Sequence, residues 1–212
     1  MLNINQVAFG LDKYVLGATD QRMGVWVQGC SLTCVGCSSA HTWANNKGKH
    51  VRVDSLIKLA KAQTVRPAGL TISGGEPSSQ AAEVLKLVRA FREVFPETEV
   101  NLFTGFAWSD FIKNHRQLVD VLDVVIAGPY DHTLPASPMA GSSNQEVILL
   151  TGLAENLYHN WINWPIHRQQ FAASGPNSVV TVGIPDTHRM ARAADKSSVL
   201  KVTWQKPIQK MA

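Results

Sequence analysis

Cysteine is scarce in this sequence. The 212 residues include only three cysteines, and all of them lie between positions 30 and 37. An odd number of thiols in one short segment cannot provide a disulfide framework, and in a reducing compartment clustered thiols more often bind a metal or take part in redox chemistry. The distribution of cysteine therefore excludes a disulfide-stapled protein and favours a metal site.

Long apolar runs and strong net charge are also absent. No stretch approaches the roughly 20 apolar residues that span a bilayer, and the first residues lack the pattern of a secretory signal. The net charge is +4, and the basic residues are scattered apart from two groups near the end, HRMARAADK and WQKPIQK. We therefore expect a soluble cytoplasmic protein with no membrane partner, and the charge pattern gives little support to a nucleic-acid partner.

The amino-acid composition is ordinary for one globular domain. Along the chain, apolar segments alternate with polar segments. Short apolar runs bounded by glycine or proline predict strands, and longer stretches with apolar residues three or four positions apart predict helices. We expect strands at 23–29, 69–75, 99–105, 121–129, 145–150 and 179–185, and helices at about 55–65, 81–95 and 108–115, the first capped by Asp54.

This order of elements predicts the fold class. Strands separated by helices of this length pack as βαβ units around a parallel sheet, so the protein is expected to be α/β. Six strands indicate a partial barrel or an open sheet, and in either arrangement ligands bind beyond the carboxyl ends of the strands. Those ends carry GC (29–30), SGGEP (73–77), FTGF (103–106) and AGPY (127–130).

Cys30, Cys34 and Cys37 follow the first strand with the spacing C-x3-C-x2-C. Neighbouring glycines at 29 and 36 let the backbone approach a bulky inorganic centre. Three interpretations are open: buried core thiols, a zinc site completed by His41, or a [4Fe-4S] cluster held by three thiolates. The third leaves one iron without a protein ligand, which has a purpose only if another molecule binds there.

The cysteine spacing after a strand resembles that of the radical S-adenosylmethionine superfamily, and SGGEP at a strand end is similar to the Gly-Gly-Glu motif of the same superfamily. With VWVQGCSLTCVGC, TISGGEP, VNLFTGF and DVVIAGPYDHTLPASPMAGSSNQEV, the chain resembles the activating proteins of anaerobic ribonucleotide reductase over about residues 1–152. It departs from them at ATDQRMG, where that family usually has an Asp-Gly-Pro-Gly-like turn.

The resemblance implies a partial (β/α)6 TIM-like barrel of the radical S-adenosylmethionine type. It divides the chain into a core at 1–152 and a C-terminal extension at 153–212, which completes the same domain, docks a partner or serves a particular substrate. A flavodoxin-like or ferredoxin-like donor would reduce the cluster, which cleaves S-adenosylmethionine to methionine and a 5′-deoxyadenosyl radical. That radical would take a hydrogen from a glycine of a partner glycyl radical enzyme.

The resemblance also assigns roles to particular residues. The predicted cluster ligands are Cys30, Cys34 and Cys37, and Glu76 is expected to meet the amino group of S-adenosylmethionine. The predicted contacts to this cofactor are Gly36, Ser38, Gly74, Gly75, Glu76, Thr104, Gly105, Asn144 and Gln145.

Simpler interpretations stand beside these. Glycines 74 and 75 could only form a turn, and the amides of Asn144 and Gln145 could only tie down a loop. His41 and Trp43 could shield a cluster or belong to the core, whereas Trp161 and Trp164 predict one face of a packed helix. The other histidines considered show no pairing typical of a catalytic base: His115, His132, His159, His167 and His188.

Two further functions are compatible with the sequence. One is a stand-alone radical S-adenosylmethionine enzyme that acts on a small molecule or a peptide. The other is a zinc-binding nucleic-acid module that uses the basic residues near the end of the chain. Metal content and colour after anaerobic reconstitution would distinguish the zinc module from the iron-sulfur enzymes.

Overall fold

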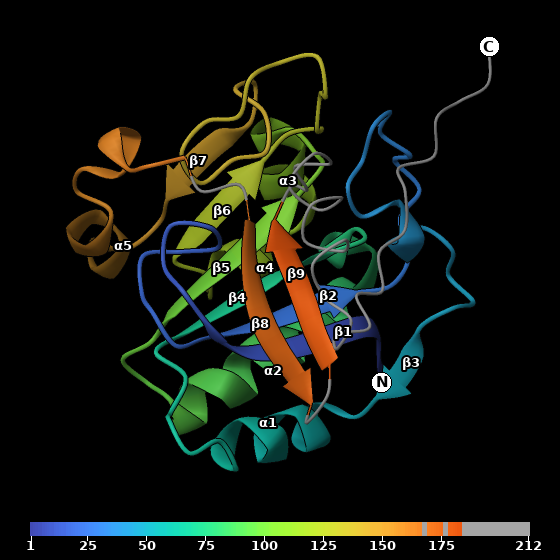
Figure 1. Cartoon of the computed structure of the whole chain (residues 1–212), viewed down its shortest axis with the longest axis vertical. Helices are drawn as coiled ribbons and strands as arrows, with labels where there is room; N and C mark the ends of the chain where they lie inside the picture. The colour runs from blue at the N-terminus through green and yellow to red at the C-terminus, as the bar shows by residue number, and fades with distance from the viewer. Residues whose placement is uncertain (167–168, 176–177, 184–212) are drawn as a thin grey trace, which may run out of the picture.

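A computed structural model describes residues 1–166, 169–175 and 178–183 (Figure 1). The basic groups HRMARAADK and WQKPIQK, together with His167 and His188, lie outside these residues. Within the described ranges, no helix combines the length and apolar character needed to cross a bilayer.

A seven-stranded mixed sheet forms the centre of the protein, with the strand order β3-β1-β2-β4-β5-β6-β7. Four neighbouring strands are parallel, and the three at the two edges run antiparallel to their inner neighbours. The parallel strands are β2 (Arg22–Val27), β4 (Gly69–Gly74), β5 (Glu99–Thr104) and β6 (Val124–Ala127). The others are β1 (Leu2–Leu11), β3 (Lys49–Val51) and β7 (Glu146–Leu149).

Helices connect the parallel strands. Their bounds are α1 (Val53–Lys61), α2 (Ala81–Val94), α3 (Trp108–Asn114) and α4 (Arg116–Val119), with the 3-10 turns η1 (Ala40–Thr42) and η2 (Pro77–Gln80). The main core lies between these helices and one face of the sheet. Alternate strand residues face it, as Met23, Val25 and Val27 do from β2, and α2 buries Val84 and Phe91 against it.

The opposite face of the sheet is covered by segments from both ends of the chain. These are residues 12–21, α5 (Gly152–Leu157), the 3-10 turn η3 (Trp161–Asn163) and a hairpin of β8 (Gln169–Gly175) and β9 (Ser178–Gly183). Figure 1 shows the hairpin in orange in front of the sheet, and Val182 packs against Ala8, Leu11 and Leu16.

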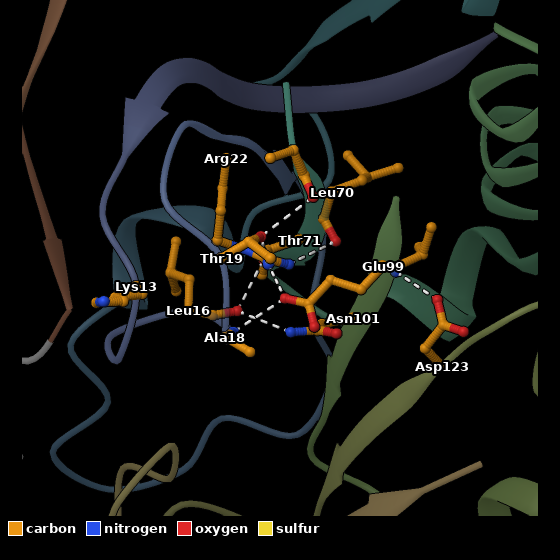
Figure 2. Close-up of polar contacts among 12 residues, drawn as sticks. Lys13, Leu16, Ala18, Thr19, Arg22, Leu70, Thr71, Glu99, Asn101 and Asp123 are labelled. Carbon is orange, nitrogen blue, oxygen red and sulfur yellow. Dashed lines mark hydrogen bonds and ion pairs between the residues drawn. The ribbon is translucent and has the colours of Figure 1, made fainter. Parts of the chain in front are cut away.

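A buried charged pair lies under residues 12–21 (Figure 2). The guanidinium of Arg22 contacts the carboxylate of Glu99, and both side chains are fully buried. Burial lowers the pKa of Arg22 to about 10, so the group stays charged at neutral pH. Arg22 also donates to the hydroxyls of Thr19 and Thr71 and to the carbonyl of Leu70. These contacts offset part of the cost of removing both charges from water, while Oε2 of Glu99 is buried with no hydrogen-bond partner among the described residues.

The pair is connected to the loop at 12–21. The backbone N–H of Ala18 donates to Glu99 at 2.9 Å. The carbonyl of Leu16 accepts from the hydroxyl of Thr71 at 2.8 Å and from the amide of Asn101 at 3.0 Å. The loop is therefore fixed to the sheet by polar contacts that the sequence pattern did not reveal.

The α/β class is confirmed, as are the strands that became β2, β4, β5, β6 and β7. The six-stranded (β/α)6 barrel is not confirmed, because β7 is antiparallel to β6 and the strand expected at 179–185 belongs to the separate hairpin. Strands β1, β3 and β8 were not predicted. The division of the chain at residue 152 stays a prediction.

Two local predictions were wrong. Helix α1 begins at Val53 after Arg52, and Asp54 pairs with Arg52 in the first turn instead of capping the helix. Trp161 and Trp164 do not share a helix face, because only a three-residue 3-10 turn forms there. Both indoles nevertheless pack against the cluster around Ile126.

Candidate functional site

The loops after the four parallel strands surround one cavity of about 210 Å³. Carboxyl ends of parallel strands meet at one edge of a sheet, so this location agrees with the sequence prediction. The cavity is lined by most of the predicted site residues: Cys30, Cys34, Cys37, Ser38, Gly74, Gly75, Glu76, Thr104, Gly105 and Gln145. The predicted contacts Gly36 and Asn144 are not among the lining residues.

The cysteine loop is tied to the segment that follows it. The N–H of Gly29 donates to the carbonyl of Thr42 at 2.7 Å, and that of Cys30 donates to the carbonyl of Trp43 at 3.1 Å. Gly36 has a φ of +75°, and a Cβ there would collide with the side chain of His132. Gly36 is therefore needed for the turn and for contact with the loop at 129–145, rather than for lining the cavity.

The three thiols are free and partly buried. Burial raises the pKa of Cys30 and of Cys37, so without iron these thiols are protonated at neutral pH. Binding of an iron-sulfur cluster requires thiolates and would release those protons.

The donor set fits a cluster. Three sulfurs line one cavity, and a cluster with an open iron needs three thiolates and space beside them. Among the described residues, no group of three or more His, Cys, Asp and Glu side chains converges as a single metal ion requires. His41, the fourth ligand of the zinc interpretation, does not line the cavity, whereas Trp43 does.

The Gly-Gly-Glu turn packs directly on the start of the cysteine loop. The N–H of Gly75 donates to the carbonyl of Val27 at 2.9 Å, and the N–H of Glu76 donates to the carbonyl of Gly29 at 2.8 Å. Gly74 has a φ of +107°, and a Cβ on Gly75 would overlap the carbonyl oxygen of Gly29. The two glycines therefore allow two backbone segments to touch.

The buried carboxylate of Glu76 joins the ends of β4 and β5. Its Oε1 accepts from the N–H of Ser78 at 3.0 Å, the hydroxyl of Ser78 at 2.7 Å and the hydroxyl of Thr104 at 3.0 Å. Its Oε2 accepts from the N–H of Gly105 at 2.8 Å. Among the described residues, Oε2 therefore accepts only one hydrogen bond, against three at Oε1, and keeps acceptor capacity beside the cavity.

The turn after β5 also contacts the cysteine loop. A Cβ on Gly105 would overlap the side chain of Leu32, which lies between Cys30 and Cys34. The ends of β2, β4 and β5 are therefore held together by glycine contacts and by one carboxylate.

The two predicted amides hold the loop after β6. Gln145 donates to the carbonyl of Gly128 at 2.9 Å and accepts from the N–H groups of Gly141 and Ser142. Asn144 donates to the carbonyl of Pro129 at 2.8 Å. Tying down this loop was the simpler interpretation of both amides, and the contacts agree with it. Gln145 additionally lines the cavity.

The sequence prediction missed the apolar side of the cavity. Trp26 and Phe103 lie one residue before the ends of β2 and β5, and alternation along each strand could have placed both on the site face. Other members come from loops and from the C-terminal segment, for which no local signal exists, among them Tyr14, Val15, Leu16, Met139 and Ile166.

Comparison with known proteins also indicates an iron-sulfur protein. The family described as a 4Fe-4S single cluster domain matches residues 17–148. The anaerobic ribonucleoside-triphosphate reductase-activating protein of Escherichia coli K12 is 28% identical over 140 residues, which cover 63% of this chain and 91% of the relative. The protein of the same name from Enterobacteria phage T4 is 30% identical over 130 residues, covering 59% and 82%.

A second kind of activating enzyme also matches. The pyruvate formate-lyase-activating enzyme of Listeria monocytogenes is 27% identical over 111 residues, which cover 50% of this chain and 45% of the relative. The family match at 17–148 includes the cysteine loop and the Gly-Gly-Glu turn that line the cavity. The chain therefore belongs to the 4Fe-4S single-cluster family of radical S-adenosylmethionine activating enzymes, whose cofactors are a [4Fe-4S] cluster and S-adenosylmethionine.

Proposed function

We propose that this protein activates a glycyl radical enzyme of the anaerobic ribonucleotide reductase kind. The observation that carries the proposal is the convergence of Cys30, Cys34, Cys37 and the Gly-Gly-Glu turn on one cavity at the carboxyl ends of the parallel strands. The relatives that match most of their own length are activating proteins of that reductase. A flavodoxin-like or ferredoxin-like protein is the expected electron donor.

When bound, the cluster and S-adenosylmethionine would supply the radical chemistry, a one-electron reductive cleavage of a carbon–sulfur bond, and the protein would hold and shield them. Cys30, Cys34 and Cys37 would hold the cluster, and the cavity beside them would hold S-adenosylmethionine. The surrounding apolar residues, including Trp26 and Phe103, would exclude water from the reactive centre.

Glu76 has two roles in this proposal. Its Oε1 fixes the turns after β4 and β5, and its Oε2 has the capacity to accept from the ammonium group of S-adenosylmethionine. The remaining predicted contacts to this cofactor are proposed as well: Gly36, Ser38, Gly74, Gly75, Thr104, Gly105, Asn144 and Gln145. Of these, Gly36 and Asn144 would act through the loops that they shape.

The test is activation of an anaerobic ribonucleoside-triphosphate reductase from the same source. The reconstituted chain, dithionite, S-adenosylmethionine and the reductase are combined without oxygen, and the glycyl radical is measured by electron paramagnetic resonance. We expect a radical signal on the reductase that depends on S-adenosylmethionine.

Cleavage of S-adenosylmethionine without any radical on the reductase would contradict the proposed partner. That outcome would favour a stand-alone enzyme acting on a small molecule or a peptide. The positive control is Val35→Ala, which should still give the radical signal. Val35 is an exposed residue of the cysteine loop that does not line the cavity.

A further inference from the structure

Part of the cavity is built by residues outside the family match. The match covers 17–148, yet Tyr14, Val15 and Leu16 before it and Ile166 and Gly183 after it line the cavity. Segments from the two ends of the chain thus meet on one side of the site. This side belongs to the chain itself rather than to the shared family domain.

Tyr14 is held in an uncommon backbone conformation on this side. Its φ is +74°, which is rare for a bulky residue, and its N–H donates to the carbonyl of Gly17 at 2.8 Å. Backbone strain of this kind persists only when the surroundings over-determine it, and it is concentrated at functional sites.

Trp164 is the group that packs behind Tyr14. The two rings form an edge-to-face contact, with centroids 5.1 Å apart and planes at 68°. Trp164 also contacts the ring of Tyr158, with centroids 5.1 Å apart and planes tilted by 34°. Such arrangements are favourable for aromatic pairs. A row of three aromatic rings therefore runs from the interior to the edge of the cavity.

Tyr158 anchors this row in the protein. Its side chain is fully buried, and its hydroxyl accepts from the amide of Asn101 at 2.6 Å and donates to Glu99 at 3.3 Å. Burial raises the pKa of Tyr158, so the hydroxyl keeps its proton at neutral pH. The row of rings is thereby connected to the buried Arg22–Glu99 pair under the sheet face.

Ile166 lies two residues beyond Trp164, at the mouth of the cavity. It lines the cavity and is 51% exposed, so its side chain borders both the site and the solvent. Replacement of such a side chain changes the opening without removing a core contact.

We propose that Tyr14 and Ile166, which line the cavity, form a specificity-determining wall with Trp164, which does not line the cavity but packs against the ring of Tyr14. This wall limits the size of the molecules reaching the cysteine loop. The exposed side chain of Ile166 and the residue Tyr14 both belong to the cavity lining, so a change in the size of either alters the space beside the cysteine loop. The proposal rests on the proposed function only in placing the cluster at Cys30, Cys34 and Cys37.

The test measures access to the cluster with two iron(II) chelators of different size. The full-length, cluster-loaded chain is reduced without oxygen and without S-adenosylmethionine, and loss of cluster absorbance is followed with 2,2′-bipyridine or with the bulkier bathophenanthroline disulfonate. We expect Ile166→Ala, which shortens a lining side chain, and Trp164→Ala, which removes the ring packed against Tyr14, to raise the rate with the bulky chelator by about threefold to tenfold. The rate with bipyridine should change less.

Two further variants control the experiment. Ile166→Trp should slow the bulky chelator, because it enlarges the wall. Ile162→Ala should leave both rates unchanged, because Ile162 is 69% exposed in the same segment and does not line the cavity. The Ile166 variants keep the test valid if Trp164→Ala fails to fold.

Equal bulky-chelator rates in Ile166→Ala, Ile166→Trp and Ile162→Ala would overturn the proposal. A parallel rise with both chelators would overturn it too, since the substitutions would then weaken cluster binding rather than widen the opening. Neither chelator rate depends on activation of a reductase. The experiment therefore tests the specificity-determining wall separately from the proposed function.

Discussion

The two sides of the cavity are built by different kinds of contact. On the cysteine side, backbone touches backbone: Gly75 lies on Gly29, and Glu76 links two strand ends through hydrogen bonds. On the apolar side, rings pack on rings, as Trp164 does on Tyr14. The first side lies within the family match at 17–148, and much of the second lies outside it.

The difference indicates how each side tolerates change. A backbone contact leaves no space for even one methyl group, so the cysteine side accepts few substitutions. An apolar wall keeps its function with side chains of another size, at a different width of opening. The chemistry is therefore expected to depend on the first side and the choice of substrate on the second.

The largest effect should follow from removing a cluster ligand. Cys34→Ala leaves two thiolates, which cannot anchor the cluster while one iron stays open. We expect complete loss of visible absorbance and of 5′-deoxyadenosine formation, measured after anaerobic reconstitution. Val35→Ala should keep both, because that exposed neighbour lies outside the cavity lining. A brown, active Cys34→Ala protein would show that this cysteine is not a ligand.

Gly75→Ala should destabilise the cysteine side strongly. The new methyl group would overlap the carbonyl of Gly29, so the two turns must separate, at a cost of about 3 kcal/mol. Thermal unfolding and iron content measure the change. Gly152→Ala is the matched control, because a Cβ there meets nothing within 4 Å. Equal loss in both variants would contradict the close contact.

Glu76→Ala should leave iron content nearly unchanged but weaken binding of S-adenosylmethionine. The substitution removes the proposed ammonium contact and loosens the turns after β4 and β5, so the free energy of binding should fall by about 2 kcal/mol. Equilibrium dialysis with the cluster-loaded chain measures it. Thr104→Val, which removes one donor to Glu76 but no carboxylate, should have a smaller effect. Unchanged affinity in Glu76→Ala would remove Glu76 from the cofactor site.

Tyr158→Phe should have the smallest effect of these variants. It deletes a hydroxyl that pairs with Asn101 and Glu99, both buried, and the free energy of unfolding should fall by about 1 to 2 kcal/mol. Urea unfolding of the apoprotein measures this. A stability equal to that of the parent chain would show that the C-terminal segment is not anchored through this hydroxyl.

The strands around the site were predictable because their signals are local. A buried strand such as MGVWVQG is a short apolar run, and a helix such as α2 repeats apolar residues at helical spacing. Strand β1 was missed because LNINQVAFGL begins with alternating amides, and Asn3 and Asn5 hydrogen-bond to residues distant in sequence. The orientation of β7 also depends on pairing that no local pattern encodes.

The candidate site also combines features with a local sequence signal and features that depend on long-range contacts. The spacing of Cys30, Cys34 and Cys37 and the Gly-Gly-Glu motif are local, so the cysteine side was predictable. The pairing of Arg22 with Glu99 joins residues 77 positions apart, and the contact of Tyr14 with Trp164 joins the two ends of the described chain. Neither the residue types nor their spacing in the sequence predicts these long-range contacts.

The central claim is that Cys30, Cys34 and Cys37 hold one [4Fe-4S] cluster at which S-adenosylmethionine is cleaved. The most direct measurement is iron and sulfide analysis of the anaerobically reconstituted chain, followed by chromatography of the products formed with S-adenosylmethionine and dithionite. We expect about four irons and an equal amount of sulfide per chain, together with 5′-deoxyadenosine and methionine. A colourless protein that holds about one zinc per chain and forms no 5′-deoxyadenosine would contradict the account.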